Sequence, residues 1–215
     1  MIIDKKRYNV RGFIGGGLTC IDPDQLKRPL HAAEVLGLMR NLAGKFLDTW
    51  RPDHSPEDMD TYEQFFLGAI TTSAEGKARE TILGGHQLLA TLLLLLRYLH
   101  RRTEGHRCQG YLESVVFFFT YGERRGHSLE ALLHDQGASW DEDPESMCNL
   151  AARYRDIIQN FPEEITDNVV PIFVDWLLGC VTLDYFTGYT KDGTLILRKA
   201  LAWEKWQGGG PNRNP

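Results

Sequence analysis

A leucine-rich apolar segment, from Leu88 to Leu96, limits what this chain can fold into more than any other feature of its sequence. Leucine is a strong helix former, and the segment is followed by the cations Arg97, Arg101 and Arg102, which favour the C-terminal end of a helix. The pattern therefore predicts a helix over residues 86–102. Because the apolar run is much shorter than the roughly 20 residues that a membrane span requires, we expect this helix to be buried inside a globular domain.

The composition is that of an ordinary folded domain. The chain has 215 residues, of which 42% are hydrophobic and 25% are charged, so it can bury a large core and is neither disordered nor a coiled coil. Its 24 Lys and Arg against 29 Asp and Glu give a net charge of -5, which excludes a globally basic nucleic-acid-binding protein. Residues 1–7 become charged at once and lack the apolar segment of a signal peptide, so we expect a cytoplasmic protein without a membrane partner.

The spacing of apolar residues predicts a mixed α+β fold. Strands are expected over residues 8–14, 18–21, 65–72, 80–83 and 181–189, and further helices over residues 35–46, 143–162 and 169–178. The strands at 65–72 and 80–83 form a predicted hairpin, with a turn at 73–77, which leads into the leucine-rich helix. Residues 51–60 have the composition of an exposed loop, and residues 112–121 fit either a strand or a helix.

The turn between the predicted hairpin and the leucine-rich helix is the strongest candidate for a ligand site. Its glycines, Gly84 and Gly85, permit a close approach of the backbone to a ligand, and the first turn of a helix offers N–H groups that bind anions. His86 and Gln87 are placed to contact a phosphate there. The alternative is ordinary turn chemistry, with both side chains as polar residues of a first helical turn.

Other groups of reactive side chains lack a spacing that supports a site. We expect reduced core thiols rather than a disulfide framework or zinc site at Cys20, Cys108, Cys148 and Cys180. No metal-ligand pattern fits His100, His106, Cys108 and His127, and the sequence assigns neither a metal ligand nor a catalytic residue. The sequence also contains a basic group, whose members are Arg97, Arg101, Arg102, Arg107, Arg124 and Arg125. These residues could contact phosphate, or they could simply be the solvated end of a helix.

Several segments taken together resemble the N-terminal domain of GmrSD-type restriction endonucleases. Residues 65–70 (FFLGAI) and 82–92 (ILGGHQLLATL) are similar to the family's yFLGsI and iiDGQQRLtTL segments. The family's QRPY.W, NliaRY and FidWLl segments have counterparts at 27–30 (KRPL), 149–154 (NLAARY) and 173–178 (FVDWLL). The resemblance implies a ParB/sulfiredoxin-like α+β fold whose DGQQR turn binds and hydrolyses a nucleotide. In the family, this powers the restriction of modified or foreign DNA by an HNH nuclease domain.

The chain departs from the family pattern at the positions that carry its chemistry. Gly85 and Gln87 match the DGQQR motif, but Gly84 replaces the acid, His86 the first glutamine and Leu88 the arginine. Loss of the acid and the arginine removes the groups that would orient a metal or water and neutralise phosphate charge. We therefore expect a degenerate, non-catalytic sensor or interaction component, with candidate nucleotide-binding residues Arg28, Gly84, Gly85, His86 and Gln87. A nucleoside triphosphate with Mg is the cofactor that the resemblance implies where the site still functions.

Two alternatives stay open at this point. One is an active nucleotide-hydrolysing subunit, with His86 substituting in the site, which works with a separate HNH nuclease; no HNH-like motif occurs in this chain. The other is a nucleic-acid-binding module that uses the basic group. The candidate partners are accordingly a nucleotide, a nuclease subunit or a second copy of the chain, and contact with DNA is left open.

The expected organisation has three parts. Residues 1–120 are expected to form the degenerate ParB/sulfiredoxin-like nucleotide-site domain, residues 121–206 a mainly helical part, and residues 207–215 a flexible tail. Because the resemblance fades after residue 183, we also expect an incompletely covered apolar surface, formed by Phe173, Trp176 and Tyr185. Exposed apolar area of this kind favours self-association or a bound partner.

Overall fold

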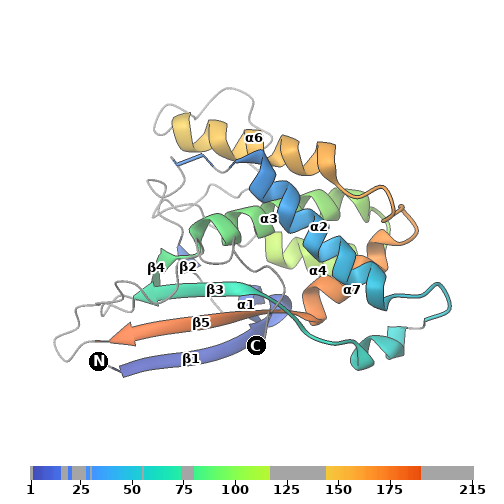
Figure 1. Ribbon diagram of the computed structural model, residues 1–215, viewed down its shortest axis with the longest axis horizontal. Coiled ribbons are helices and arrows are strands. Elements are labelled where there is room, and N and C mark those ends of the chain that lie inside the picture. The colour runs from blue at the N-terminus through green and yellow to red at the C-terminus, as the bar shows by residue number, and fades with distance from the viewer. Residues whose placement is uncertain are drawn as a thin grey trace, which may run out of the picture.

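A computed structural model describes residues 2–15, 19–20, 28–29, 31–54, 56–73, 80–116 and 144–189. The described elements, in chain order, are β1 (Ile2–Asn9), α1 (Val10–Gly15), β2 (Thr19–Cys20), α2 (Ala32–Thr49), the 3-10 helix η2 (Pro56–Thr61), β3 (Phe65–Ser73), β4 (Glu80–Gly84), α3 (His86–Arg102), α4 (Arg107–Val116), α6 (Pro144–Asn160), α7 (Val170–Gly179) and β5 (Val181–Tyr189). The strands form one mixed sheet, and α2, α3, α6 and α7 lie on one side of it (Figure 1). The predicted α+β class is confirmed.

The sheet has the strand order β1-β5-β3-β4-β2 within the described residues. β5 pairs antiparallel with β1 and parallel with β3, and β3 pairs antiparallel with β4, with Thr72 opposite Ile82. The predicted hairpin between β3 and β4 is therefore confirmed. β5 comes from the part of the chain predicted to be mainly helical, yet it is an interior strand between β1 and β3. The domain boundary predicted at residue 120 lies outside the described residues, as do the turn residues 74–77 and the tail 207–215.

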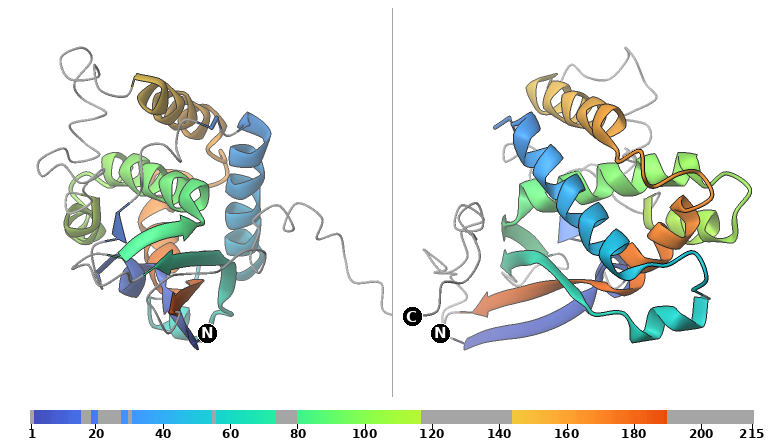
Figure 2. Two further views of the ribbon diagram at one scale, coloured as in Figure 1. Left: turned by 90° about the vertical axis from the view of Figure 1, so that its left-hand side faces the viewer. Right: turned by 45° about the vertical axis from the view of Figure 1, so that its right-hand side comes forward.

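The leucine-rich helix α3 lies at the centre of the molecule, between the sheet and α6, and contacts β3, α4, α6 and α7 (Figure 2). Every side chain from Leu88 to Leu96 is buried, as expected for a helix that is apolar on all sides. None of the helices in the described ranges is both long and apolar enough to span a membrane.

An aromatic cluster joins α2, α7 and β3. The ring of Phe46 lies 5.3 Å from that of Phe173 and 5.6 Å from that of Trp176, and Phe65 stacks near Trp176 at 6.4 Å. Phe173 and Trp176 are only 2% and 1% exposed, so the prediction of an incompletely covered surface at these two rings is wrong. The reason is that the rings of Phe46, Phe65 and Phe161 pack against them, which leaves Phe173 and Trp176 unavailable to a second copy of the chain.

The N-terminal strand differs from its prediction. A strand was expected over residues 8–14, but β1 runs from Ile2 to Asn9 and a short helix begins at Val10. Asn9 ends the strand because its side-chain oxygen accepts a hydrogen bond from the Gly12 amide at 2.7 Å, which caps α1. β1 also pairs with β5 over its whole length, so charged residues 4–7 lie in a strand.

Two helices and the cysteines differ in part from the sequence-based expectations. The segment 51–60, expected to be a loop, includes the beginning of the 3-10 helix η2. Residues 112–116 are helical, in α4, and residues 117–121 of that segment lie outside the described residues. Cys108 and Cys180 are buried free thiols, as expected, but Cys148 lies on the exposed face of α6 and is not a core residue.

Candidate functional site

Gly85 fixes how the hairpin leads into α3. Its φ is +88°, in the left-handed region, and a Cβ there would lie 2.6 Å from Ile70 Cδ1 and 2.7 Å from the Ala69 carbonyl oxygen. Both the conformation and the packing against β3 therefore require glycine. Gly84 is different, because a Cβ would make only ordinary contacts with Thr71, at 3.6 Å. The chain has room for a side chain at position 84 but carries none.

The side chains of His86 and Leu88 face the protein interior. His86 is buried, and its Nε2 lies 2.8 Å from the carbonyl oxygen of Ile82, so Nε2–H is the donor to the strand that precedes the helix. Leu88 is 1% exposed and belongs to the hydrophobic core. Two of the positions matched to the DGQQR motif thus contribute to packing and to the strand–helix connection.

Gln87, the second residue of α3, joins two other segments. Its side-chain nitrogen donates to the carbonyl oxygen of Arg28 at 3.2 Å, and its side-chain oxygen accepts from Nη2 of Arg153 at 2.5 Å. Arg28 comes from the segment before α2, and Arg153 from the middle of α6. The structure therefore brings Arg28, Gly84, Gly85, His86 and Gln87 to one place, and the side chain of Arg28 itself is exposed.

Arg153 is a member of this site that the sequence analysis did not single out. It is 2% exposed, and its Nε and Nη1 are buried without a hydrogen-bond partner. Burial lowers the pKa of Arg153 to about 10, while the carboxylates of Glu34 and Asp156 act in the opposite direction. The guanidinium therefore remains positively charged at neutral pH.

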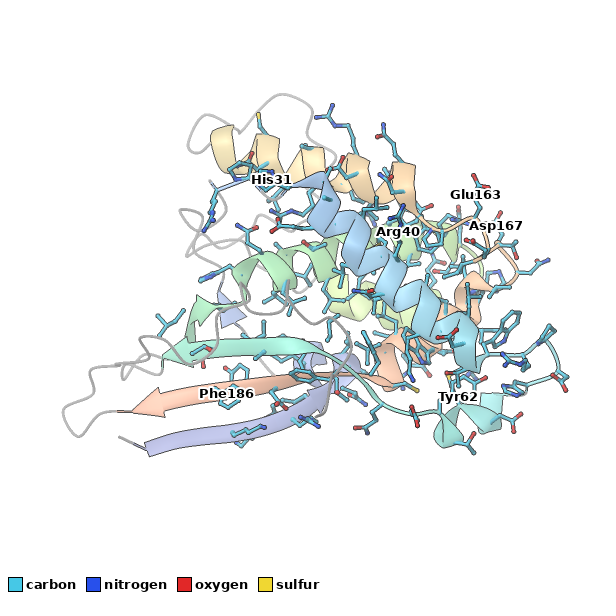
Figure 3. The ribbon with its side chains drawn as sticks, viewed as in Figure 1. His31, Arg40, Tyr62, Glu163, Asp167 and Phe186 are labelled. Atoms are coloured by element: carbon cyan, nitrogen blue, oxygen red, sulfur yellow. The ribbon has the colours of Figure 1, made fainter. Side chains whose placement is uncertain are left out.

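Glu34 approaches this site from α2. Its Oε2 accepts a hydrogen bond of 3.0 Å from the His31 amide, which stabilises the first turn of α2. His31 lies immediately before α2, on the side of the molecule where α3 also begins (Figure 3). The N-terminal ends of α2 and α3 lie on this same side in Figures 1 and 2. Helix N-termini carry a partial positive charge that favours an anion, whereas the Glu34 carboxylate opposes one.

The signal that could have identified Arg153 is its position on α6. Leu150, Tyr154 and Ile157 are buried and follow helical spacing, and Arg153 lies within that same apolar stripe. A charged residue at a core position is uncommon, and it points to a specific partner or a function. Sequence alone could not name that partner, because Gln87 is 66 positions away along the chain.

The described members of the other candidate groups are not assembled into a site. Among the described residues there is no group of three or more His, Cys, Asp or Glu side chains that could hold a metal ion; His127 lies outside those residues. In the basic group, Arg97 is buried with a nitrogen 3.1 Å from His100 Nδ1, and Arg102 donates to Asp167 at 2.8 Å. Arg124 and Arg125 lie outside the described residues.

Neither a scan against protein-family models nor a search of curated proteins finds a match to this chain. The resemblance to the GmrSD-type family therefore rests on the sequence segments alone.

Proposed function

We propose that this chain is a degenerate GmrSD-type domain, with a ParB/sulfiredoxin-like fold, that binds a nucleotide at the start of α3 without hydrolysing it. Its role would be that of a non-catalytic cytoplasmic sensor or interaction component in the restriction of modified or foreign DNA. One observation carries the proposal: Gln87 is hydrogen-bonded to both Arg28 and Arg153. Three of the segments that carry the family resemblance, which are distant in sequence, thus meet at the predicted nucleotide site.

The lack of hydrolysis follows from the side chains at the start of α3. Phosphoryl transfer needs groups that orient a metal or a water molecule and that neutralise charge in the transition state. Gly84 supplies no carboxylate, and Leu88 lies in the core. The glycine turn and the helix N-terminus remain, and backbone N–H groups can bind phosphate without any of the lost side chains.

Two observations favour this role over the alternatives. An active subunit would need His86 to act on the nucleotide, but the buried imidazole donates its Nε2–H to the carbonyl oxygen of Ile82. A nucleic-acid-binding module would need an accessible basic surface. Arg97 is buried, however, and Arg102 is paired with Asp167, which leaves Arg101 and Arg107 as the exposed members of the basic group among the described residues.

Titration of the purified chain with ATP and GTP in the presence of Mg²⁺ tests the proposal. We expect saturable binding by calorimetry, with no release of phosphate above the background rate. Gln87→Ala should weaken binding by about tenfold, because the loss of its hydrogen bonds to Arg28 and Arg153 releases the two segments that it holds at the site. The exposed Gln159 on α6 provides the control, and Gln159→Ala should bind like the wild type.

Each of the other results contradicts the proposal in a different way. Steady hydrolysis by the wild-type chain would make it an active enzyme subunit. If neither nucleotide binds to the wild-type chain, the start of α3 is only a structural turn.

A further inference from the structure

Resting on the proposed function, a more specific inference concerns Arg153: we propose that its guanidinium binds a phosphate group of the ligand at the start of α3. It would take the place of the arginine that the DGQQR motif puts at position 88. The ligand class is a compound with a phosphate or pyrophosphate group, recognised through its oxygens. The contact comes from α6 rather than from the motif itself.

The hydrogen bonding of Arg153 is incomplete. Of its donors, one on Nη2 is used by Gln87, whereas Nε and Nη1 have no partner although the residue is 2% exposed. Buried donors in folded proteins are nearly always paired, because an unpaired one loses its hydration without compensation. A buried cation with free donors is therefore a site where an anion is expected to bind.

The surroundings of Arg153 select a phosphate. Gln87 holds the guanidinium at the second residue of α3, so a ligand on Arg153 would also face the first turn of that helix. Helix N-terminal amides and arginine both bind phosphate oxygens well. The carboxylates of Glu34 and Asp156 influence Arg153 through their charge and oppose an anion, and neither accepts a hydrogen bond from Nε or Nη1.

The burial of Leu88 explains why the guanidinium would come from a different helix. Position 88 points into the core between α3 and its neighbours, where an arginine would be desolvated without a partner. α6 crosses α3 and places Arg153 beside Gln87. In this arrangement Arg153 supplies the positive charge at the site, although position 88 of the motif carries an apolar side chain.

The experiment compares Arg153→Met with Arg155→Met, using pyrophosphate and ATP as probes. Arg155 is two residues further along α6 and is exposed, which makes it a matched control. Arg153→Met should bind both probes at least tenfold more weakly than the wild type, and Arg155→Met should bind them with unchanged affinity. Without ligand, Arg153→Met should unfold at the same or a higher temperature, because methionine fills similar space and carries no unpaired donors.

A second pair of variants extends the test. Arg153→Lys keeps the charge but has a single nitrogen in place of the planar guanidinium, and it should also bind pyrophosphate more weakly. Glu34→Gln removes the opposing carboxylate and should strengthen pyrophosphate binding severalfold. If Arg153→Met fails to fold, these two variants decide the question by themselves.

The outcomes separate this inference from the proposed function. If the wild type binds ATP and the Arg153 variants bind it equally well, the inference is overturned and the proposed function stands. A lowered melting temperature in Arg153→Met, with unchanged affinity for pyrophosphate, identifies Arg153 as a structural residue and also overturns it. If the wild-type chain binds neither probe, the proposed function fails, and the inference fails with it.

Discussion

Arg7 and Asp184 face each other directly across the pairing of β1 with β5, and two hydrogen bonds join their side chains. Arg7 Nε donates to Asp184 Oδ1 at 2.6 Å, and Arg7 Nη2 donates to Oδ2 at 3.1 Å. Lys5 Nζ lies 3.0 Å from the same Oδ2. The hydrogen bond from Arg7 is the main reason why the pKa of Asp184 is below its usual value, and Lys5 acts in the same direction.

This pair predicts a specific loss of stability in acid. Because the pKa of Asp184 is lower in the folded chain than in the unfolded chain, its contribution is complete above the unfolded value, near pH 4. The contribution disappears as the pH falls through the lowered folded value. We expect Asp184→Asn to be less stable than the wild type at pH 7, with the difference shrinking below pH 4.

Urea unfolding between pH 7 and pH 2 measures this difference directly. The exposed Asp48 on α2 supplies the control, and Asp48→Asn should follow the wild-type profile. A constant difference between Asp184→Asn and the wild type, down to pH 2, would show that the pair does not titrate as its geometry implies.

Substitution of Gly85 should be strongly destabilising. Gly85→Ala places a methyl group in the left-handed conformation, at about 1–2 kcal/mol, and against the backbone of Ala69, where overpacking adds about 1–3 kcal/mol. The free energy of unfolding should therefore fall by roughly 2–5 kcal/mol. Gly44→Ala is the control, because Gly44 lies within α2 with nothing near its Cβ position; it should stabilise the chain by up to about 1 kcal/mol. Equal effects would contradict the close packing of the turn on β3.

The aromatic cluster predicts a large effect at Phe46. This side chain is fully buried and contacts the rings of Trp50, Phe173 and Trp176, so Phe46→Ala should lower the free energy of unfolding by about 3–5 kcal/mol. Ile158, which is 44% exposed on α6, is the control, and Ile158→Ala should change it by less than about 0.5 kcal/mol. Chemical denaturation would measure both. A small effect of Phe46→Ala would mean that α2 and α7 do not pack as described.

The thiols should differ in reactivity. Cys148 is exposed on α6, while Cys108 and Cys180 are buried, and burial raises the pKa of Cys108 and so reduces its reactive thiolate. A maleimide added to the native chain should label Cys148 within minutes and leave the two buried thiols unmodified, as peptide mapping by mass spectrometry would show. Rapid labelling of Cys108 would contradict its burial beside α3. Unfolding in denaturant, where all four thiols of the chain, Cys20 included, should react, provides the control.

Local patterns in the sequence predicted the elements that depend on local spacing. The apolar periodicity of residues 35–46 and the leucine run at 88–96 correspond to α2 and α3, and the hairpin of β3 and β4 forms between the expected residues. At the N-terminus, the same reasoning extended a strand through Val10. The apolar residues Val10 and Phe13 favour a strand there, but the Asn9 side chain caps a helix instead, and the composition of the segment does not show this cap.

The candidate site was predictable only in part, for a physical reason. The glycine turn and Gln87 are recognisable because their conformational and polar properties are local. The burial of Arg153 depends on where α6 crosses α3, a contact between residues 66 positions apart that no local pattern contains. The place of β5 between β1 and β3 is a long-range property of the same kind.

That interior position of β5 has a consequence for the order in which the protein folds. β1 pairs with β5, so during synthesis the N-terminal strand has to wait for residues 181–189 before its backbone groups find their partners. The hairpin of β3 and β4, with α3, requires only short loops and can form much earlier. Closing the long loop between β1 and β5 is entropically costly and slow. We therefore expect the nascent chain to pass through a state in which α3 and its hairpin are formed while β1 remains unpaired, so that it is open to misassociation until β5 docks between its two neighbours.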